Sequence, residues 1–275
     1  MTNEKNYEKY SKFATRVRVH CLQMTCRGKS GHIGSMLSMA DLLAVLYLKI
    51  LRVDPKNHKN PNRDRFILSK GHAGAAVYAT LAELGFFPME WLDTYYLDNG
   101  KLSGHISHLV PGVEFSTGSL GHGLPVAVGM ALAAKQSGQK HRVFCLMSDG
   151  DCNEGSTWEA IMFAAQHKLD NLTVVVDYNR VQALGKTKDV IEMEPFAKKL
   201  EAFGWAVKKV AGHDYRDIEN GLSKLPLEKG KPFWVLARTI KGYPISWMMD
   251  TVSCHYKVVN KEEMVAALKE LGAGT

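Results

Sequence analysis

The sequence predicts an α/β fold, a parallel sheet with helices on both faces. Apolar runs of strand length recur at residues 65–68, 143–148, 172–177 and 233–237, and segments with helical periodicity separate them. No low-complexity linker or internal repeat interrupts the 275 residues. An apolar content of 45% can form one large core or two modest ones. We therefore predict a single domain over residues 1–275.

Helices are expected to flank this sheet. Periodicity predicts helices over residues 4–23 and 42–51, the second capped by Ser38 with Asp41 three residues later. Residues 73–84 predict a helix after the first strand, and residues 261–271 a final helix. The Gly-rich residues 118–123 lead into an apolar helix over 124–134, whose free N-terminal amides would favour an anion. The alternative for this loop is a buried turn without a ligand.

The strands at 143–148 and 172–177 are separated by one amphipathic helix, whose start is signalled by Ser156 followed by Glu159. Such a βαβ unit has parallel strands, whose carboxyl ends meet at one edge of the sheet. Ligands bind at that edge. Because Asp149 and Asn179 lie just after the two strands, they are expected to be spatial neighbours.

Carboxylate and amide oxygens are ligands that Mg²⁺ or Ca²⁺ accepts, and Mg²⁺ commonly adds phosphate oxygens and water. Asp149 and Asn179 therefore indicate a metal-diphosphate site, and Gly150 allows close approach of the backbone. The alternative is an N-capping Asp and a turn Asn, the commoner use of such residues after strands. Spacing alone does not separate the two interpretations.

The flanking residues resemble the thiamine diphosphate motif of transketolases, with Ser148 at the position of the motif's first glycine. The resemblance implies thiamine diphosphate and Mg²⁺ as cofactors, with Ca²⁺ able to substitute. It implies that Asp149, Asn179 and the carbonyl of Val181 bind the metal. It also implies that Glu154 lies at an interface between subunits and helps couple paired active sites.

Four further segments match the same family in its order, at residues 30–34, 68–73, 104–105 and 116–121. The likeness thus extends from about residue 10 to residue 260. The cofactor-binding residues that it implies are His72, Gly118, Ser119, Leu120, Asp149, Gly150, Glu154, Asn179 and His255. The candidate catalytic residues are His32, His105 and His255. Imidazole suits such roles because it can donate or accept a proton near neutral pH.

Two histidines in the C-terminal part receive different interpretations. The family carries a His-Gly pair after its last strand, and that histidine reaches the diphosphate and a substrate hydroxyl; here His255 is followed by Tyr256. His213 lies in a Gly-His-Asp segment that also recurs in the family. We interpret His213 as structural and exclude it from the site.

The resemblance implies transfer of a two-carbon ketol unit from a ketose phosphate to an aldose. A complete transketolase continues into a pyrimidine-binding domain, which holds an essential Glu, and a third domain. We therefore expect the N-terminal subunit of a split transketolase, which requires a separate C-terminal subunit in an α₂β₂ assembly. The alternatives are a component of another thiamine diphosphate enzyme (a 2-oxo acid dehydrogenase α subunit or a deoxyxylulose phosphate synthase-like protein) and a non-catalytic interaction paralogue.

Composition argues against other classes. The net charge is +7, but the basic residues are spread along the chain rather than gathered with aromatics, which argues against nucleic-acid binding. Residues 28–30 and 185–187 resemble Walker ends but lack the required earlier glycine. No signal peptide or membrane-length apolar stretch is found, so no membrane association and a cytoplasmic location are expected. The cysteines lack CxxC pairs, so reduced thiols are expected: Cys21, Cys26, Cys145, Cys152 and Cys254.

Overall fold

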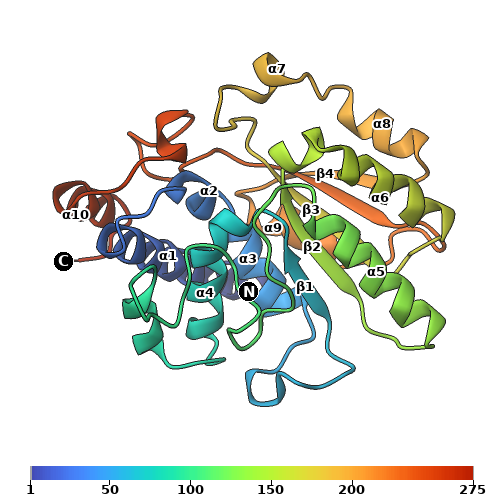
Figure 1. Cartoon of the computed structure of the whole chain (residues 1–275), viewed down its shortest axis with the longest axis horizontal. Helices are drawn as coiled ribbons and strands as arrows, with labels where there is room; N and C mark the ends of the chain where they lie inside the picture. Colours follow the sequence, from blue (N-terminus) through green and yellow to red (C-terminus); the bar gives the residue numbers. More distant parts are fainter. Residues whose placement is uncertain (1, 275) are drawn as a thin grey trace.

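A five-stranded parallel sheet forms the centre of the protein, in a computed structural model that describes residues 2–274 (Figure 1). The strand order is β1-β2-β3-β5-β4. The strands are β1 (Arg65–Leu68), β2 (Val143–Ser148), β3 (Leu172–Tyr178), β4 (Ala206–Ala211) and β5 (Phe233–Arg238). The predicted fold class is confirmed. Met1 and Thr275, which the single-domain prediction includes, lie outside the described residues.

Helices cover both faces of the sheet (Figure 1). The helices of the chain are α1 (Thr2–Arg27), α2 (Ile33–Ser38), α3 (Ala40–Val45), α4 (Gly74–Glu83), α5 (Gly123–Gln136), α6 (Gly155–Gln166), α7 (Thr187–Val190), α8 (Phe196–Ala202), α9 (Tyr215–Leu222) and α10 (Lys261–Glu270). Within residues 2–274, no helix combines the length and the apolar character needed to cross a membrane. The five cysteines carry free thiols.

The alternation of side chains along the strands divides the core into two layers. Phe144, Leu146 and Val175 pack with α1, α3, α4 and α9 on one face of the sheet. Cys145 and Val174 point to the opposite face, where they pack with α5, α6 and α8. Strands buried on both sides read as continuous apolar runs, which is why the sequence revealed them.

Two predicted helix caps are wrong. The predicted helix over 42–51 is α3 followed by a π-helical turn ending at Ile50, and the Ser38 hydroxyl donates to Asp177 Oδ2 (2.6 Å) instead of capping it. Similarly, α6 begins at Gly155, and the Ser156 hydroxyl donates to the carbonyl of Gly121 (2.9 Å). In both cases the serine hydroxyl bonds to a residue that is distant in the sequence, instead of to a backbone N–H of its own helix.

Sequence patterns alone did not reveal β4 and the short helices α2, α7, α8 and α9. β4 is an edge strand with a mixed pattern of burial, and it contains Lys208 and Lys209. Lysines are common on edge strands because they discourage pairing with other chains. A pair of adjacent lysines suggests an exposed face; Lys209 is exposed, whereas Lys208 is half-buried.

Candidate functional site

A cavity of about 330 Å³ lies at the carboxyl edge of the sheet, where β2 and β3 end. Ten of the twelve residues predicted for the site line it: His32, His72, His105, Gly118, Leu120, Asp149, Gly150, Asn179, Val181 and His255. Ser119 and Glu154 do not line it, and both are exposed. The structure thus brings together segments separated by more than two hundred residues.

Asp149 directly follows β2 and is only 2% exposed. Its Oδ2 accepts a hydrogen bond from the Thr187 hydroxyl (2.6 Å), and its Oδ1 accepts one from the Gly150 N–H (3.0 Å). Burial raises the pKa of this carboxyl, and the nearby Asp177 carboxylate adds to the rise. Within the described chain, no Lys, Arg or His forms an ion pair with it. A buried carboxylate without an ion pair fits a bound cation.

Asn179 directly follows β3, as predicted, and is 4% exposed. Its Oδ1 accepts a hydrogen bond from the Val181 N–H (3.1 Å), and its Nδ2 donates to Asp177 Oδ2 (3.3 Å). Asn179, Val181 and Asp149 all line the cavity, so one carboxylate, one amide and one carbonyl offer hard oxygen atoms there. Residues 2–274 contain no cluster of three or more metal-binding His, Cys, Asp or Glu side chains. The set therefore fits a hard cation that takes its other ligands from phosphate or water.

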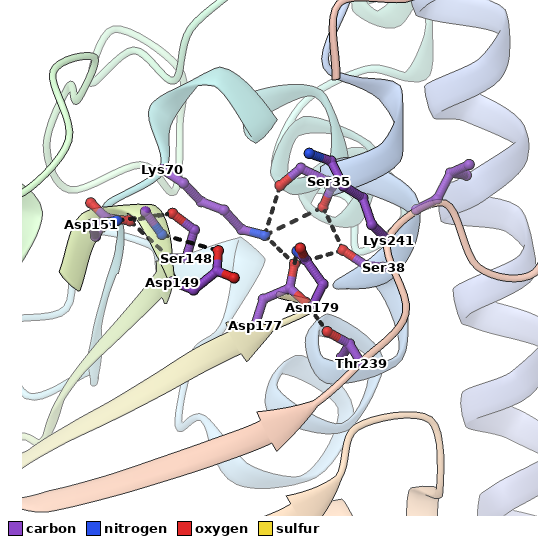
Figure 2. Close-up of polar contacts among 12 residues, drawn as sticks. Ser35, Ser38, Lys70, Ser148, Asp149, Asp151, Asp177, Asn179, Thr239 and Lys241 are labelled. Atoms are coloured by element: carbon purple, nitrogen blue, oxygen red, sulfur yellow. Dashed lines mark hydrogen bonds and ion pairs between the residues drawn. The ribbon is translucent and has the colours of Figure 1, made fainter. Parts of the chain in front are cut away.

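A fully buried ion pair lies beside these residues (Figure 2). Lys70 Nζ contacts Asp177 Oδ2, and both side chains are completely buried. Ser38 and Thr239 also donate hydrogen bonds to Asp177. Burial would raise the pKa of Asp177, but the Lys70 ammonium outweighs it and holds the pKa below its usual value. Asp177 is therefore charged and can orient the Asn179 amide.

Four histidine rings gather at the cavity, as the sequence predicted. The ring of His32 lies 4.9 Å from that of His72, 5.1 Å from His255 and 6.3 Å from His105, measured between centroids. Burial, with nearby positive groups adding to it, lowers the pKa of His32 to about 4 and that of His255 to about 3. Burial also holds the pKa of His72 well below its usual value. These three rings are therefore neutral at pH 7 and can donate one hydrogen bond and accept another.

Lys241 is the one Lys or Arg among the residues that line the cavity, and no sequence pattern singles it out. It is 1% exposed. Its Nζ donates to the carbonyl of Val181 (2.9 Å) and lies 2.8 Å from His255 Nδ1. Burial lowers its pKa. A buried cation next to the oxygen-rich end of the cavity favours an anionic ligand.

Asp151 anchors the Gly-rich loop. Its Oδ1 accepts hydrogen bonds from the Gly121 N–H (2.9 Å) and the Ser69 hydroxyl (2.7 Å), and its Oδ2 accepts from the Ser148 N–H (2.8 Å). The Gly121 amide, which lies just before α5, is thus occupied by a protein carboxylate. Gly118, three residues earlier, still lines the cavity.

Comparisons with known proteins agree with this geometry. A family model described as "Transketolase, thiamine diphosphate binding domain" matches residues 10–274. The chain is 44% identical to a protein of Actinobacillus succinogenes that is named as one subunit of apulose-4-phosphate transketolase, over 97% of each protein. It is 39% identical to 6-deoxy-6-sulfo-D-fructose transketolase subunit SqwG of Clostridium sp., over 88% of each.

Solved structures of longer transketolases are also similar. The transketolase of Leishmania mexicana superposes with a TM-score of 0.91 at 29% identity, covering 96% of this chain and 41% of that protein. The Campylobacter jejuni enzyme gives a TM-score of 0.90 at 30% identity, covering 98% of this chain and 43% of that protein. This chain thus spans less than half of those longer proteins. It belongs to the transketolase family, as a thiamine diphosphate-binding domain.

Proposed function

We propose that this chain is the thiamine diphosphate-binding subunit of a two-chain transketolase. The observation that supports this most is the meeting, in one cavity, of the oxygen donors at the ends of β2 and β3 with four histidine rings. Near-complete alignment with a protein that is itself named as one transketolase subunit supports the two-chain form. The proposed reaction moves a two-carbon ketol unit from a ketose phosphate to an aldose.

In this proposal, Asp149, Asn179 and the Val181 carbonyl hold Mg²⁺, with Ca²⁺ able to replace it. His72, Lys241, Leu120, His255 and the backbone at Gly118 and Gly150 contact the anionic cofactor. Ser119 and Glu154, the other two predicted binding residues, lie outside the cavity, and for Glu154 we propose the role at the subunit interface. Thiamine diphosphate supplies the carbanion chemistry that amino-acid side chains lack. The protein's part is binding, orientation and proton handling.

The neutral histidines are suited to orienting the substrate and handling protons. His32 and His255 have pKa values of about 4 and 3, so both rings are neutral at pH 7. His32 can offer one N–H and one unprotonated ring nitrogen, whereas His255 offers its N–H, because its Nδ1 lies 2.8 Å from the Lys241 ammonium. They can hold substrate hydroxyls in a fixed orientation and relay a proton between them. His105 completes the group, with its ring centroid 6.3 Å from that of His32.

A complementary subunit is proposed to cover the cavity and complete the site, with two copies of each chain in the assembly. Leu184 and Tyr256 line the cavity, yet they are 86% and 65% exposed. Exposed apolar side chains at the rim of a site fit a protein partner. The names of the relatives indicate sugar derivatives as substrates, apulose 4-phosphate for one and a sulfonated fructose for another. We propose that this chain acts on a sugar phosphate in the same way, in the cytoplasm.

Reconstitution with a C-terminal transketolase subunit tests this function. The complex should transfer a ketol unit from xylulose 5-phosphate or apulose 4-phosphate to an aldose only when thiamine diphosphate and Mg²⁺ are present, and Asp149→Ala should abolish the transfer. Decarboxylation of pyruvate without ketol transfer would instead support another thiamine diphosphate enzyme. Cofactor binding without either reaction would support an interaction paralogue.

A further inference from the structure

A buried carboxylate–imidazole pair lies outside the cavity, behind the segment that carries Lys241. Asp41 belongs to α3 and is 1% exposed, and His213 lies in the turn between β4 and α9. His213 Nδ1 is 2.8 Å from Asp41 Oδ2, and the Ile240 N–H donates to His213 Nε2 (2.9 Å). A backbone N–H can only donate, so Nε2 carries no proton and the Nδ1–H donates to Asp41. The two partners thus fix the ring as one neutral tautomer.

Asp41 is itself held rigidly. Arg18 donates two hydrogen bonds to its carboxylate (3.0 and 2.6 Å), and the Tyr215 hydroxyl donates a third (2.6 Å). Burial would raise the pKa of Asp41, but the Arg18 guanidinium and the hydrogen bond from His213 outweigh it and keep the pKa at about 2. The carboxylate therefore stays charged and orients the imidazole at all ordinary pH values. A bidentate Arg–carboxylate pair also restricts its rotation.

Residues 239–243 form the segment that follows β5, and His213 makes one of several contacts that fix it. The Gly242 N–H donates to the Gly34 carbonyl (3.0 Å), and Gly242 has φ of +80° with no space for a Cβ beside Met248. The Tyr243 ring stacks on the His213 ring at 3.8 Å. The hydrogen bond at Ile240 is the contact immediately before Lys241 in the chain, so it sets the direction in which the lysine leaves the backbone.

We propose that Asp41 and His213 form a positioning pair for the cofactor cavity, in which His213 holds the Ile240 backbone so that Lys241 faces Val181 and His255. Neither residue of the pair lines the cavity, so neither is a catalytic residue. The inference rests on the proposed function, since it assigns the Lys241 ammonium to an anionic cofactor. It gives the Gly-His-Asp segment a role that its sequence alone did not reveal.

Two substitutions separate the two hydrogen bonds of His213. His213→Gln places an amide oxygen near the position of Nε2 and can still accept from Ile240. His213→Asn places an amide nitrogen near the position of Nδ1, which keeps the bond to Asp41 but leaves the Ile240 N–H without its acceptor. His167→Asn, at an exposed position after α6, is the matched control. Amide hydrogen exchange across residues 239–243 and the dissociation constant of thiamine diphosphate with Mg²⁺ are measured, the latter in the complex with the C-terminal subunit.

We expect His213→Asn to accelerate exchange at Ile240 and to weaken cofactor binding, each by about tenfold, the effect of losing one hydrogen bond. His213→Gln keeps the acceptor for Ile240 but loses the bond to Asp41, so it should have a smaller effect than His213→Asn in both measurements. His167→Asn should match wild type. Wild-type exchange in His213→Asn would overturn the positioning role, and so would faster exchange with unchanged cofactor affinity. If the wild-type complex binds no cofactor, the proposed function fails and the Lys241 assignment fails with it, while the exchange data still decide whether His213 holds Ile240.

Discussion

Burial sets the charge of individual side chains in the cavity. It lowers the pKa of His32, His72 and His255, so these rings are neutral, and it raises the pKa of Asp149. Each shift disfavours the charged form of the group in a poorly hydrated site. The neutral rings are suited to hydrogen bonding with sugar hydroxyls, and the buried carboxylate is suited to a cation.

The lowered pKa of His32 predicts how stability depends on pH. The unfolded chain takes up a proton at this residue near pH 6.5, whereas the folded chain resists protonation until about pH 4. The unfolded state therefore binds more protons in this range, and the free energy of unfolding falls as the pH is lowered. In urea unfolding between pH 7 and 5, His32→Gln should reduce this slope, by at most about 1.4 kcal/mol per pH unit. An equal or steeper slope in the variant would contradict the shift.

Sequence reasoning identified single residues well where the backbone alone places them. Asp149 and Asn179 could be predicted to be neighbours because parallel strands end at one edge. Lys241 and the Lys70–Asp177 pair could not be found this way, because their environment depends on packing between distant segments. A buried lysine and an exposed one look the same in a sequence.

At the level of the elements, the Lys70–Asp177 pair joins β3 to the turn after β1, and Ser38 and Thr239 connect it to α2 and to the end of β5 (Figure 2). Four segments thus meet around one carboxylate, next to the cavity-lining Asn179. The arrangement holds these four segments rigidly next to the site, since movement of any of them would expose or separate buried charges.

Removing the negative charge of this pair is predicted to be costly. Asp177→Asn keeps the shape of the side chain but leaves the Lys70 ammonium buried without a counter-charge, so the free energy of unfolding should fall by about 3–5 kcal/mol in chemical denaturation. Asp98→Asn, at an exposed position, should change it by less than about 0.5 kcal/mol. Equal stability of the two variants would show that the pair contributes little to holding the elements together.

The elements that the sequence predicted are those with strong internal patterns. β2, β3 and β5 are apolar throughout and buried on both sides. β4 was missed because an edge strand with lysines does not show that pattern. The helices α2 and α7 to α9 were missed because they have only four to eight residues. The starts of α3 and α6 were misassigned because the serines proposed as caps bond to distant partners.

At the scale of the whole molecule, the cavity opens at a rim that includes the exposed Leu184 and Tyr256. In the proposed assembly the complementary subunit packs over this rim. The sequence could suggest such a partner only through family resemblance, because the surface that it covers is formed by loops that are distant in the sequence.

A charged residue at the rim should therefore weaken assembly. Leu184→Asp is expected to raise the dissociation constant for the C-terminal subunit by at least about tenfold, since it places a charge in an apolar contact. Leu227→Asp is the control, because Leu227 is also exposed but precedes β5, at the opposite edge of the sheet. Isothermal titration calorimetry measures both. Equal effects of the two substitutions would place the interface elsewhere.

The central claim is that the ends of β2 and β3 form a metal-dependent thiamine diphosphate site. The most direct test titrates thiamine diphosphate into the wild-type chain and Asp149→Ala, with and without Mg²⁺ and with the C-terminal subunit present. We predict binding that requires Mg²⁺ in the wild type and is weakened at least ~100-fold by the substitution, because a direct metal ligand is lost. Binding that is indifferent to both Mg²⁺ and Asp149, or no binding by the wild-type complex, would contradict the account.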